Sequence, residues 1–297
     1  MSAPAKRLVV FGGNGFLGSR ICRAAVSRNW DVVSVSRSGQ PHWSSITSSP
    51  TPPAWSHRVA WERGDIFRPE QWTSLLPGAT YVVHSLGILL EADYKGAISG
   101  RENPLTALAR TFGSSSRVPR PRNPLERVRE EGVPEPGVEP PTNPRQLTYE
   151  LMNRDSAILL AREAERAGVK AFGFVSAAAG APVLPARYIG TKREAEAVIA
   201  REFPGMRGVF FRPPFMYDES RKITLGIAAL ATAGSTVNGL TGGVLGGLLG
   251  AMVTKPLKVD DVADAVVEAL TDGSVKGPVE VPQLEELASR AWRRTML

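Results

Sequence analysis

The chain has 297 residues, of which 42% are hydrophobic and 22% are charged, so it is long and apolar enough to bury a sizeable core. Its formal net charge of +7 is typical of proteins that meet anionic ligands or surfaces, but no basic helix with interleaved aromatic residues indicates nucleic acid. A single cysteine excludes an internal disulfide, and three scattered histidines give no cluster with metal-ligand spacing, so no metal site is expected.

The first unit of the chain reads as a strand, a tight turn and a helix. Residues 8–11 form a short apolar run that predicts a buried strand, and apolar residues recur at helical spacing from position 16. Between them, glycines permit positive φ and a close approach of the backbone to a ligand, while the helix N-terminus favours a phosphate. The spacing of Gly12, Gly15 and Gly18 therefore predicts a dinucleotide-binding turn, with a plain glycine-rich turn as the alternative.

The end of the second predicted strand, residues 31–36, bears on the choice of cofactor. A protein that binds NAD usually has an acidic residue there, which holds the ribose hydroxyls. This chain has Ser36, Arg37 and Ser38 instead, and an arginine with two hydroxyls suits a 2′-phosphate. The sequence therefore favours NADP(H) over NAD(H), with an exposed loop arginine as the alternative.

The rest of the chain alternates predicted strands and helices. Further strands are expected at 58–62, 80–84, 171–176 and 208–212, and helices at 69–76, 147–167, 189–203, 259–270 and 284–294. Eight of the 24 prolines lie between Pro119 and Pro144 among charged residues, which predicts a flexible insertion at about 100–146. We expect an α/β fold: a single Rossmann-type domain, 1–297, with a doubly wound, mostly parallel sheet and a small C-terminal lobe at about 213–297.

One tyrosine and one lysine have the spacing of a proton-transfer pair. Tyr188 and Lys192 are four residues apart on a predicted helix, so both lie on one face. A nearby ammonium stabilises phenolate and lowers the pKa of the tyrosine, which can then exchange a proton with a substrate while hydride moves to or from nicotinamide. Ser176, at the end of the fifth predicted strand, can orient the same substrate oxygen. The alternative is a solvated helix face on which Lys192 pairs with Glu196.

Together these residues resemble the extended or atypical branch of the short-chain dehydrogenase/reductase superfamily. Its cofactor turn matches the three glycines, its adenine-side acid matches Asp65, and its catalytic set matches Ser176, Tyr188 and Lys192. The cofactor-binding residues implied by this resemblance are Gly12, Gly13, Asn14, Gly15, Phe16, Leu17, Gly18, Ser36, Arg37, Ser38, Asp65, Ile66, Ser85, Leu86, Gly87, Lys192 and Pro214.

Four longer segments narrow the resemblance. These segments look like the dehydrogenase-like component of fungal coenzyme Q biosynthesis and, more distantly, the nucleotide-binding accessory subunit of respiratory complex I. They read VVFGGNGFLGSRIC, VVSVSRSG, MNRDSAILLA and RYIGTKREAE. This resemblance implies a mitochondrial location on the matrix side of the inner membrane and a multiprotein ubiquinone-biosynthesis complex as partner. It implies an NADP(H)-dependent oxidoreductase that acts on, or regulates, a polyprenylated quinone precursor. The alternatives are an assembly subunit with a structural nucleotide and a sugar-nucleotide epimerase or reductase.

Residues 223–254 carry no charged side chain. Polar residues and glycines divide the stretch into two apolar pieces, at 225–233 and 244–253, and each is too short to span a bilayer. We expect these pieces either to be buried in a substrate lobe or to form a lip that rests on membrane lipid and admits a prenyl tail.

Overall fold

The computed structural model describes residues 6–47, 49–88, 148–178, 186–218 and 255–296. These residues form a seven-stranded parallel sheet in the order β3-β2-β1-β4-β5-β6-β9, which confirms the predicted Rossmann-type fold. The strands are β1 (Arg7–Phe11), β2 (Asp31–Ser36), β3 (Val59–Arg63), β4 (Tyr81–His84), β5 (Ala171–Val175), β6 (Arg207–Phe211) and β9 (Gly277–Val279). The strand order reverses between β1 and β4, and a sheet of this kind binds ligands at that switch point.

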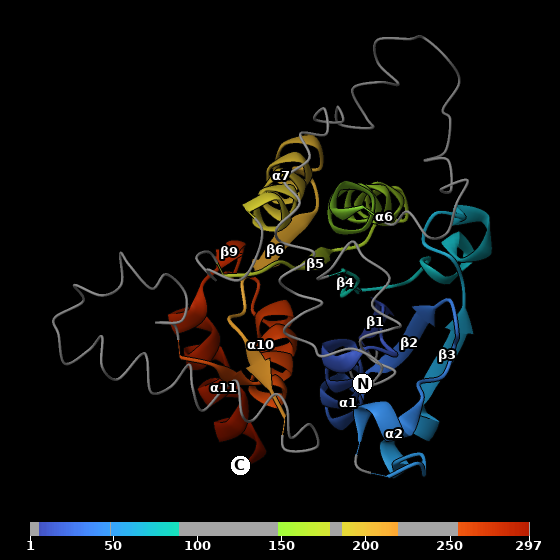
Figure 1. The fold of residues 1–297 in the computed structure, drawn as a ribbon, viewed down its shortest axis with the longest axis vertical. Helices are drawn as coiled ribbons and strands as arrows, with labels where there is room; N and C mark the ends of the chain where they lie inside the picture. The colour runs from blue at the N-terminus through green and yellow to red at the C-terminus, as the bar shows by residue number, and fades with distance from the viewer. Residues whose placement is uncertain (1–5, 48, 89–147, 179–185, 219–254, 297) are drawn as a thin grey trace, which may run out of the picture.

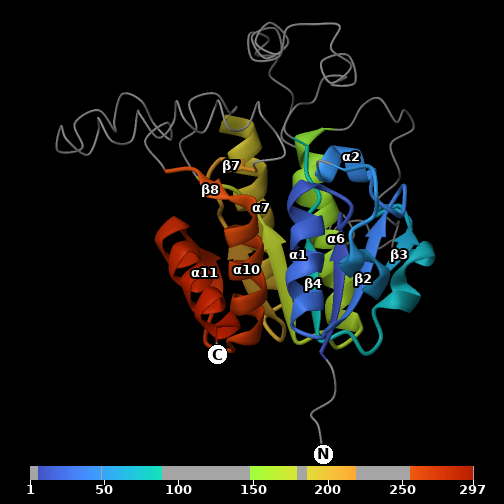
Figure 2. The same ribbon diagram turned by 90° about the horizontal axis from the view of Figure 1, so that it is seen from below.

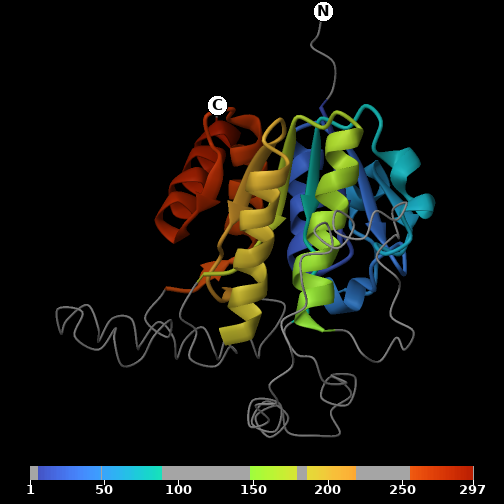
Figure 3. The same ribbon diagram turned by 90° about the horizontal axis from the view of Figure 1, so that it is seen from above.

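Helices cover both faces of the sheet (Figure 1). One face carries α1 (Phe16–Ser27), α10 (Val259–Thr271) and α11 (Val281–Thr295), which Figure 2 shows in front of the strands. The other face carries α6 (Ser156–Arg166) and α7 (Ala186–Glu202), which Figure 3 shows.

Each layer of helices packs on an apolar cluster of its own. Successive side chains of a strand point to opposite faces, so neighbouring residues of β1 enter different clusters. Val10 lies in the cluster under α1 and α10, whereas Val9 lies in the cluster under α6 and α7. This alternation leaves both faces of the sheet buried, as a parallel sheet requires.

Two stretches between strands differ from the prediction. The helix expected at 69–76 consists of two short 3₁₀ turns, Pro69–Gln71 and Thr73–Leu75, because Trp72 between them leaves the helical conformation and is fully buried. Residues 40–56, whose Ser, Pro and Thr content is typical of a loop, contain α2 (Trp43–Ile46) and the start of a 3₁₀ turn, Ala54–Arg58. Tryptophan packing explains this order, since the ring of Trp43 lies 5.7 Å from the rings of both Trp55 and Trp61.

The C-terminal part of the chain completes the main sheet. β9 pairs with β6, and α10 packs in the same apolar cluster as α1, so these elements belong to the Rossmann domain itself. Beside it, β7 (Met216–Tyr217) and β8 (Leu257–Lys258) form a small second sheet. The expected insertion at 100–146 and the uncharged stretch at 223–254 lie outside the described residues. Within the described residues, no helix is both long and apolar enough to cross a bilayer.

Candidate nucleotide-binding site and proton-transfer corner

The predicted site residues gather at one edge of the sheet. Each group follows the carboxyl end of a strand: Gly12 follows β1, Ser85 follows β4, and Ser176 follows β5. The register aligns these ends, because the last residue of β4, His84, lies opposite Phe11 on one side and Phe174 on the other. Figures 2 and 3 show that this edge is at the end of the molecule opposite to the start of β1.

The glycine turn after β1 is tightly packed, and two of its positions, Gly13 and Gly18, have no room for a side chain. Gly12 adopts a φ of +84°, and its N–H donates to Val35 O at 2.9 Å. A Cβ on Gly18 would stand 2.1 Å from Gly12 O, and a Cβ on Gly13 would stand 2.4 Å from the Ser34 hydroxyl oxygen. The turn therefore brings the start of α1 against the end of β1, and the glycines make this approach possible.

The N-terminus of α1 faces this edge without a side-chain cap. Gly15 is the N-cap residue, so no side-chain oxygen satisfies the first N–H groups of the helix, and no acidic residue stands in its first turn. Leu17 is buried and contributes only its backbone to the edge. Such a helix end is a ready site for a phosphate.

The end of β2 is joined to the glycine turn by a side-chain contact. The Asn14 amide nitrogen donates to the Ser38 hydroxyl at 2.7 Å. The Ser36 hydroxyl is buried and donates to Gly39 O at 2.9 Å, so it shapes its own turn. Arg37 is exposed, and none of the described residues accepts a hydrogen bond from its guanidinium.

The ends of β3 and β4 form the rest of this edge. One carboxylate oxygen of Asp65 accepts a hydrogen bond from Phe67 N–H at 3.1 Å, which fixes the side chain and leaves its second oxygen available. Leu86 lies against the glycine turn, 2.9 Å from the point where a Gly12 Cβ would be. Gly87 is exposed. The remaining predicted residues of this edge are Ile66, which is buried, and Ser85 and Pro214, which are half-buried.

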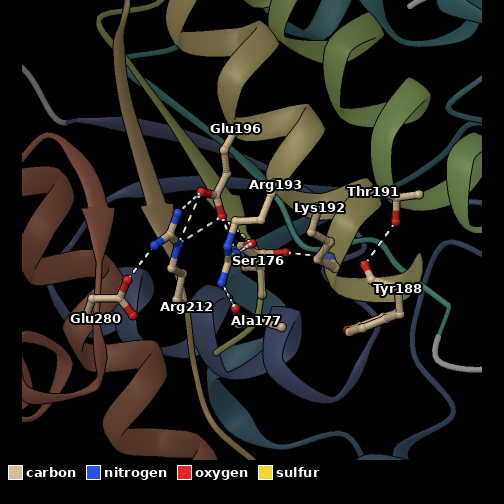
Figure 4. Close-up of polar contacts among 10 residues, drawn as sticks. Ser176, Ala177, Tyr188, Thr191, Lys192, Arg193, Glu196, Arg212 and Glu280 are labelled. Carbon is tan, nitrogen blue, oxygen red and sulfur yellow. Dashed lines mark hydrogen bonds and ion pairs between the residues drawn. The ribbon is translucent and has the colours of Figure 1, made fainter. Parts of the chain in front are cut away.

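Lys192 is buried under the carboxyl end of β5 (Figure 4). Only 2% of it is exposed, its Nζ donates to Val175 O at 2.8 Å, and Nζ lies 4.9 Å from the centre of the Phe174 ring and 5.9 Å from that of Tyr188. This burial excludes the alternative of a solvated helix face.

The expected lowering of the Tyr188 pKa is wrong. Burial raises the pKa of Tyr188 to about 12, with a smaller contribution from Tyr149, whose ring meets it edge-on at 5.7 Å. Burial lowers the pKa of Lys192 to about 7, against the attraction of Glu196. Desolvation favours the neutral form of both groups, so the lysine does not supply a full positive charge at neutral pH. Tyr188 is therefore a neutral phenol that can donate a proton.

The hydroxyl of Ser176 is held in a network of charged side chains, away from Tyr188. It donates to Glu196 Oε1 at 2.5 Å and accepts from Arg193 Nη1 at 2.8 Å, and Arg212 binds both oxygens of Glu196. A hydroxyl has one hydrogen and two lone pairs, so in this arrangement one lone pair remains for any other partner. Figure 4 shows Tyr188 on the far side of Lys192 from this network. Ser176 cannot donate to a substrate carbonyl here.

Several polar residues at this corner were missed by the sequence analysis. Arg193 lies three residues before Glu196 on α7, so that pair follows from helical spacing, whereas no motif reveals that Arg212, which follows the distant strand β6, also binds Glu196. Asn153 was also missed, although it is a fully buried polar residue in the π-helical turn Glu150–Asp155 that leads into α6. Its amide clamps the loop after β4 by two hydrogen bonds with the backbone of Ile88, at 3.1 and 3.3 Å. Asn153 lies in the segment MNRDSAILLA, which carried the resemblance but gave this residue no role.

His84 is the second buried group that sequence reasoning left unassigned. Its Nε2 lies 2.8 Å from the Ser156 hydroxyl, which itself donates to Met152 O at 2.7 Å, so Nε2–H is the donor in this pair. Burial lowers the pKa of His84 to about 3, with a further contribution from Lys192, and the imidazole is therefore neutral. Within the described residues, no group of three or more His, Cys, Asp or Glu side chains has the arrangement of a metal site.

Comparison with known sequences gives a match over most of the chain. The sequence profile of the NAD-dependent epimerase/dehydratase family matches residues 8–93. MIOREX complex component 2 of Saccharomyces cerevisiae is 40% identical over 232 residues, which cover 72% of this chain and 74% of that protein. An uncharacterized chloroplastic protein of Arabidopsis thaliana is 41% identical over 111 residues, which cover 37% of this chain and 34% of that protein.

Solved structures share the fold. The enzyme WbmG of Bordetella bronchiseptica, in complex with NAD and UDP, has a TM-score of 0.52 at 13% identity, with 98% of this chain and 79% of that chain covered. UDP-glucose 4-epimerase of Thermotoga maritima has a TM-score of 0.51 at 16% identity, with 96% and 82% covered. UDP-glucuronic acid 4-epimerase of Bacillus cereus, in complex with NAD, has a TM-score of 0.51 at 14% identity, with 93% and 78% covered. At such identities the likeness concerns the fold alone.

Proposed function

The chain belongs to the NAD-dependent epimerase/dehydratase-like branch of the short-chain dehydrogenases/reductases, together with MIOREX complex component 2 of yeast. We propose that it binds a nicotinamide dinucleotide as a member of a multiprotein complex. The observation that carries this proposal is the uncapped start of α1 behind a turn that has no room for side chains at Gly13 and Gly18. These features fit a pyrophosphate, which needs close backbone N–H groups and the positive end of a helix.

The residues at the end of β2 support NADP(H) as the preferred dinucleotide. Arg37 is exposed next to Ser38, and the described residues offer its guanidinium no carboxylate. A 2′-phosphate there would receive a charge-assisted hydrogen bond from the guanidinium and a further one from a hydroxyl. Asp65, at the end of β3, has one carboxylate oxygen left for the adenosine end of the ligand.

The corner formed by β5 and α7 supports proton transfer by Tyr188 without the help of the Ser176 hydroxyl. Nicotinamide, when bound, supplies or accepts a hydride. Tyr188 donates the accompanying proton as a neutral phenol, and the buried Lys192 lies against its ring. By resemblance, we propose a polyprenylated quinone precursor of ubiquinone biosynthesis as the substrate, at the matrix side of the inner mitochondrial membrane. That the uncharged stretch at 223–254 contacts lipid stays a prediction.

A substitution at the helix N-cap tests nucleotide binding without removing the fold. Gly15 has φ −84° and ψ 179°, which any residue adopts, and aspartate is a favoured N-cap residue. A Cβ on Gly15 would stand 3.1 Å from Gly12 O, so Gly15→Asp needs a small shift of the turn and should lower the melting temperature slightly, while its carboxylate occupies the place of the pyrophosphate. The matched control is Gly15→Asn, which has the same shape without the charge.

We expect the native protein to bind NADPH in calorimetric titrations and Gly15→Asp to bind at least about tenfold more weakly than Gly15→Asn, because like charges repel at this helix end. Arg37→Ala should reduce the affinity for NADPH and leave that for NADH unchanged. A native protein that binds neither nucleotide contradicts the proposed function, and equal native affinities for the two contradict the preference for NADP(H).

A second candidate function is an assembly subunit in which the nucleotide is structural. The capture of the Ser176 hydroxyl by Glu196 and Arg193 favours it, because this arrangement leaves no serine to polarise a substrate carbonyl. The name of the yeast relative, a component of a complex, also favours it. Both candidates need nucleotide binding, and only the first needs the phenol of Tyr188.

Complementation separates the two candidates. Tyr188→Phe keeps the aromatic packing on Tyr149 and should leave nucleotide affinity unchanged. In a yeast strain that lacks MIOREX complex component 2, the native chain should restore the missing function, with ubiquinone content and complex assembly as the measurements. If Tyr188→Phe restores both as well as the native chain does, the assembly role is correct and the oxidoreductase role is wrong.

A further inference from the structure

A hollow of about 580 Å³ lies between β8, α10 and α11. Its apolar lining includes Leu257 of β8, Tyr217 of β7 and the side of α11 that faces α10. It shares no residue with the nucleotide edge or with the proton-transfer corner. Figures 1 and 2 show α11 at the outer end of its helical layer, beside α10. The hollow is therefore a second candidate site, separate from the first.

An apolar stripe of α11 forms one wall of this hollow. Leu284, Ala288 and Trp292 line it at a spacing of four residues, which places them on one face of the helix over about 12 Å. Leu284 is buried, but Trp292 is 60% exposed, although its indole is large and apolar. An exposed tryptophan beside a hollow is typical of a protein–protein interface, where this residue is a frequent anchor.

The opposite wall, on α10, carries two carboxylates. Asp261 and Asp264 both line the hollow, and their spacing of three residues puts them on one face of the helix. Neither makes a hydrogen bond or an ion pair with any residue that the structure describes, and desolvation raises the pKa of both. Arg23, the cation that most favours ionised Asp264, is itself bound to Asp260 at 2.9 Å. The α10 wall therefore has acceptors without donors.

The cations in the lining do not neutralise these carboxylates. Lys255 binds Glu285 of α11 at 3.2 Å. Lys255 and Lys258 both attract Asp261, but desolvation outweighs this attraction, so the pKa of that carboxyl stays above its ordinary value. Arg293, the third cation of the lining, belongs to the α11 wall. The negative charge of the α10 wall is therefore left for a partner to balance.

We propose that this hollow is the docking site for an amphipathic helix of a partner protein, which places an apolar side chain against Trp292 and an arginine or lysine against Asp261 and Asp264. The inference rests on the proposed membership in a multiprotein complex. A helix laid in a groove presents its anchors at the spacing of the α11 stripe. A guanidinium donates to two carboxylates at once, and the rings of Trp292 and Tyr217 attract a cation, whereas the two carboxylates repel an anionic lipid headgroup.

Two helical peptides of about 18 residues, or five turns, test the charge of the partner. Both have an apolar face of leucine and alanine, and one carries arginines where the other carries glutamates. In calorimetric titrations we expect the native protein to bind the arginine peptide at least about tenfold more tightly. The net charge of +7 favours the glutamate peptide on general grounds, so this preference would be specific to the hollow. Equal affinities, or no binding of either peptide, overturn the inference.

Variants of the two walls locate the binding of the arginine peptide. The double variant Asp261→Asn, Asp264→Asn should bind both peptides with equal affinity, and its melting temperature checks the fold. Trp292→Ser should weaken binding of the arginine peptide at least about tenfold, because it removes the anchor. Met296→Ser is the control, since Met296 is 65% exposed on the same side of the molecule's sequence end but does not line the hollow, and its affinity should equal that of the native protein. Equal losses in Trp292→Ser and Met296→Ser contradict the docking site.

Two further measurements exclude other occupants of the hollow. Sedimentation of the protein alone detects a second copy, and flotation with cardiolipin-containing vesicles detects lipid. We expect the native protein and Trp292→Ser to behave alike in both. A dimer or a vesicle attachment that Trp292→Ser abolishes would assign the hollow to that occupant and overturn the inference. NADPH binding is titrated separately, so a native protein that binds NADPH and neither peptide contradicts this inference while nucleotide binding stands.

Discussion

The two halves of the candidate site are built by different physical means. At the β1–β4 half, the backbone makes the site: the glycine turn brings α1 against β1, and a Cβ on Gly18 would stand 2.1 Å from a carbonyl oxygen. At the β5–β6 half, side chains make the site: Glu196 holds Ser176, Arg193 and Arg212 together from three elements. One half depends on shape and the other on charge.

This difference predicts that substitutions can change the chemistry of the second half more easily than the shape of the first. A glycine turn binds through N–H groups that every residue carries, so few substitutions there are tolerated and few alter its chemistry. A hydrogen-bond network of side chains can take a hydroxyl such as that of Ser176 out of reach of a substrate without moving the backbone. The structure has kept the turn and placed the serine in an ion-pair network.

The largest effect should come from breaking the charged network. Glu196→Ala leaves Arg193 and Arg212 without their shared carboxylate in a site where Glu196 is 4% exposed, and we expect a loss of about 3–5 kcal/mol in the free energy of unfolding. Urea denaturation measures it. Glu194→Ala on the same helix is the control, because Glu194 is 48% exposed and its buried partner Arg154 keeps its ion pair with Asp155, so this variant should cost at most about 1 kcal/mol. Equal losses in the two variants would contradict the view that this half is held by charge.

The stability of the glycine turn should respond to added volume. Gly18→Ala forces a methyl group onto Gly12 O, a backbone atom that cannot rotate away, and should cost about 2–3 kcal/mol together with nucleotide binding. Gly190→Ala, in the interior of α7, should instead stabilise the protein by about 0.4–1 kcal/mol, because its Cβ meets no atom of the described residues within 4 Å and it lowers the entropy of the unfolded chain. Thermal denaturation compares them, and a stable Gly18→Ala protein would show that the turn can relax.

His84, between the two halves, should give an effect that depends on pH, and between pH 6.5 and 5 it should be at most about 2 kcal/mol. Its pKa is about 3 in the folded protein and near 6.5 when unfolded, so below pH 6.5 the unfolded chain binds more protons. Stability should therefore fall as the pH is lowered from about 6.5 toward 3, by up to about 1.4 kcal/mol per pH unit from this residue. His84→Gln, whose amide nitrogen can replace Nε2 against Ser156, should show a shallower slope between pH 6.5 and 5 in urea denaturation. Parallel slopes would mean that the imidazole titrates normally.

The contrast between a half built by backbone and a half built by side chains also explains how much of the fold and of the site could be predicted from the sequence. Short-range patterns predict the Rossmann sheet, the turn at Gly12 and the burial of strand ends, because spacing and apolar runs are local. The network around Ser176 could not be predicted, since Arg212 lies 36 residues along the chain and only the pairing of β5 with β6 brings it close. The direction of the Tyr188 pKa shift was missed for a related reason: desolvation by burial depends on packing that no spacing records.

The packing of α10 against α1 has a consequence for synthesis of the chain on the ribosome. Ile21 and Val266 belong to one apolar cluster, although the two helices stand near opposite ends of the sequence (Figure 2). At about 5–20 residues per second, α10 is made roughly 12–50 s after α1. Throughout that interval the apolar faces of α1 and of the first strands lack their cover. The nascent chain is therefore a client for chaperones until its last helices emerge, and a product that ends before α10 exposes a sheet face open to aggregation.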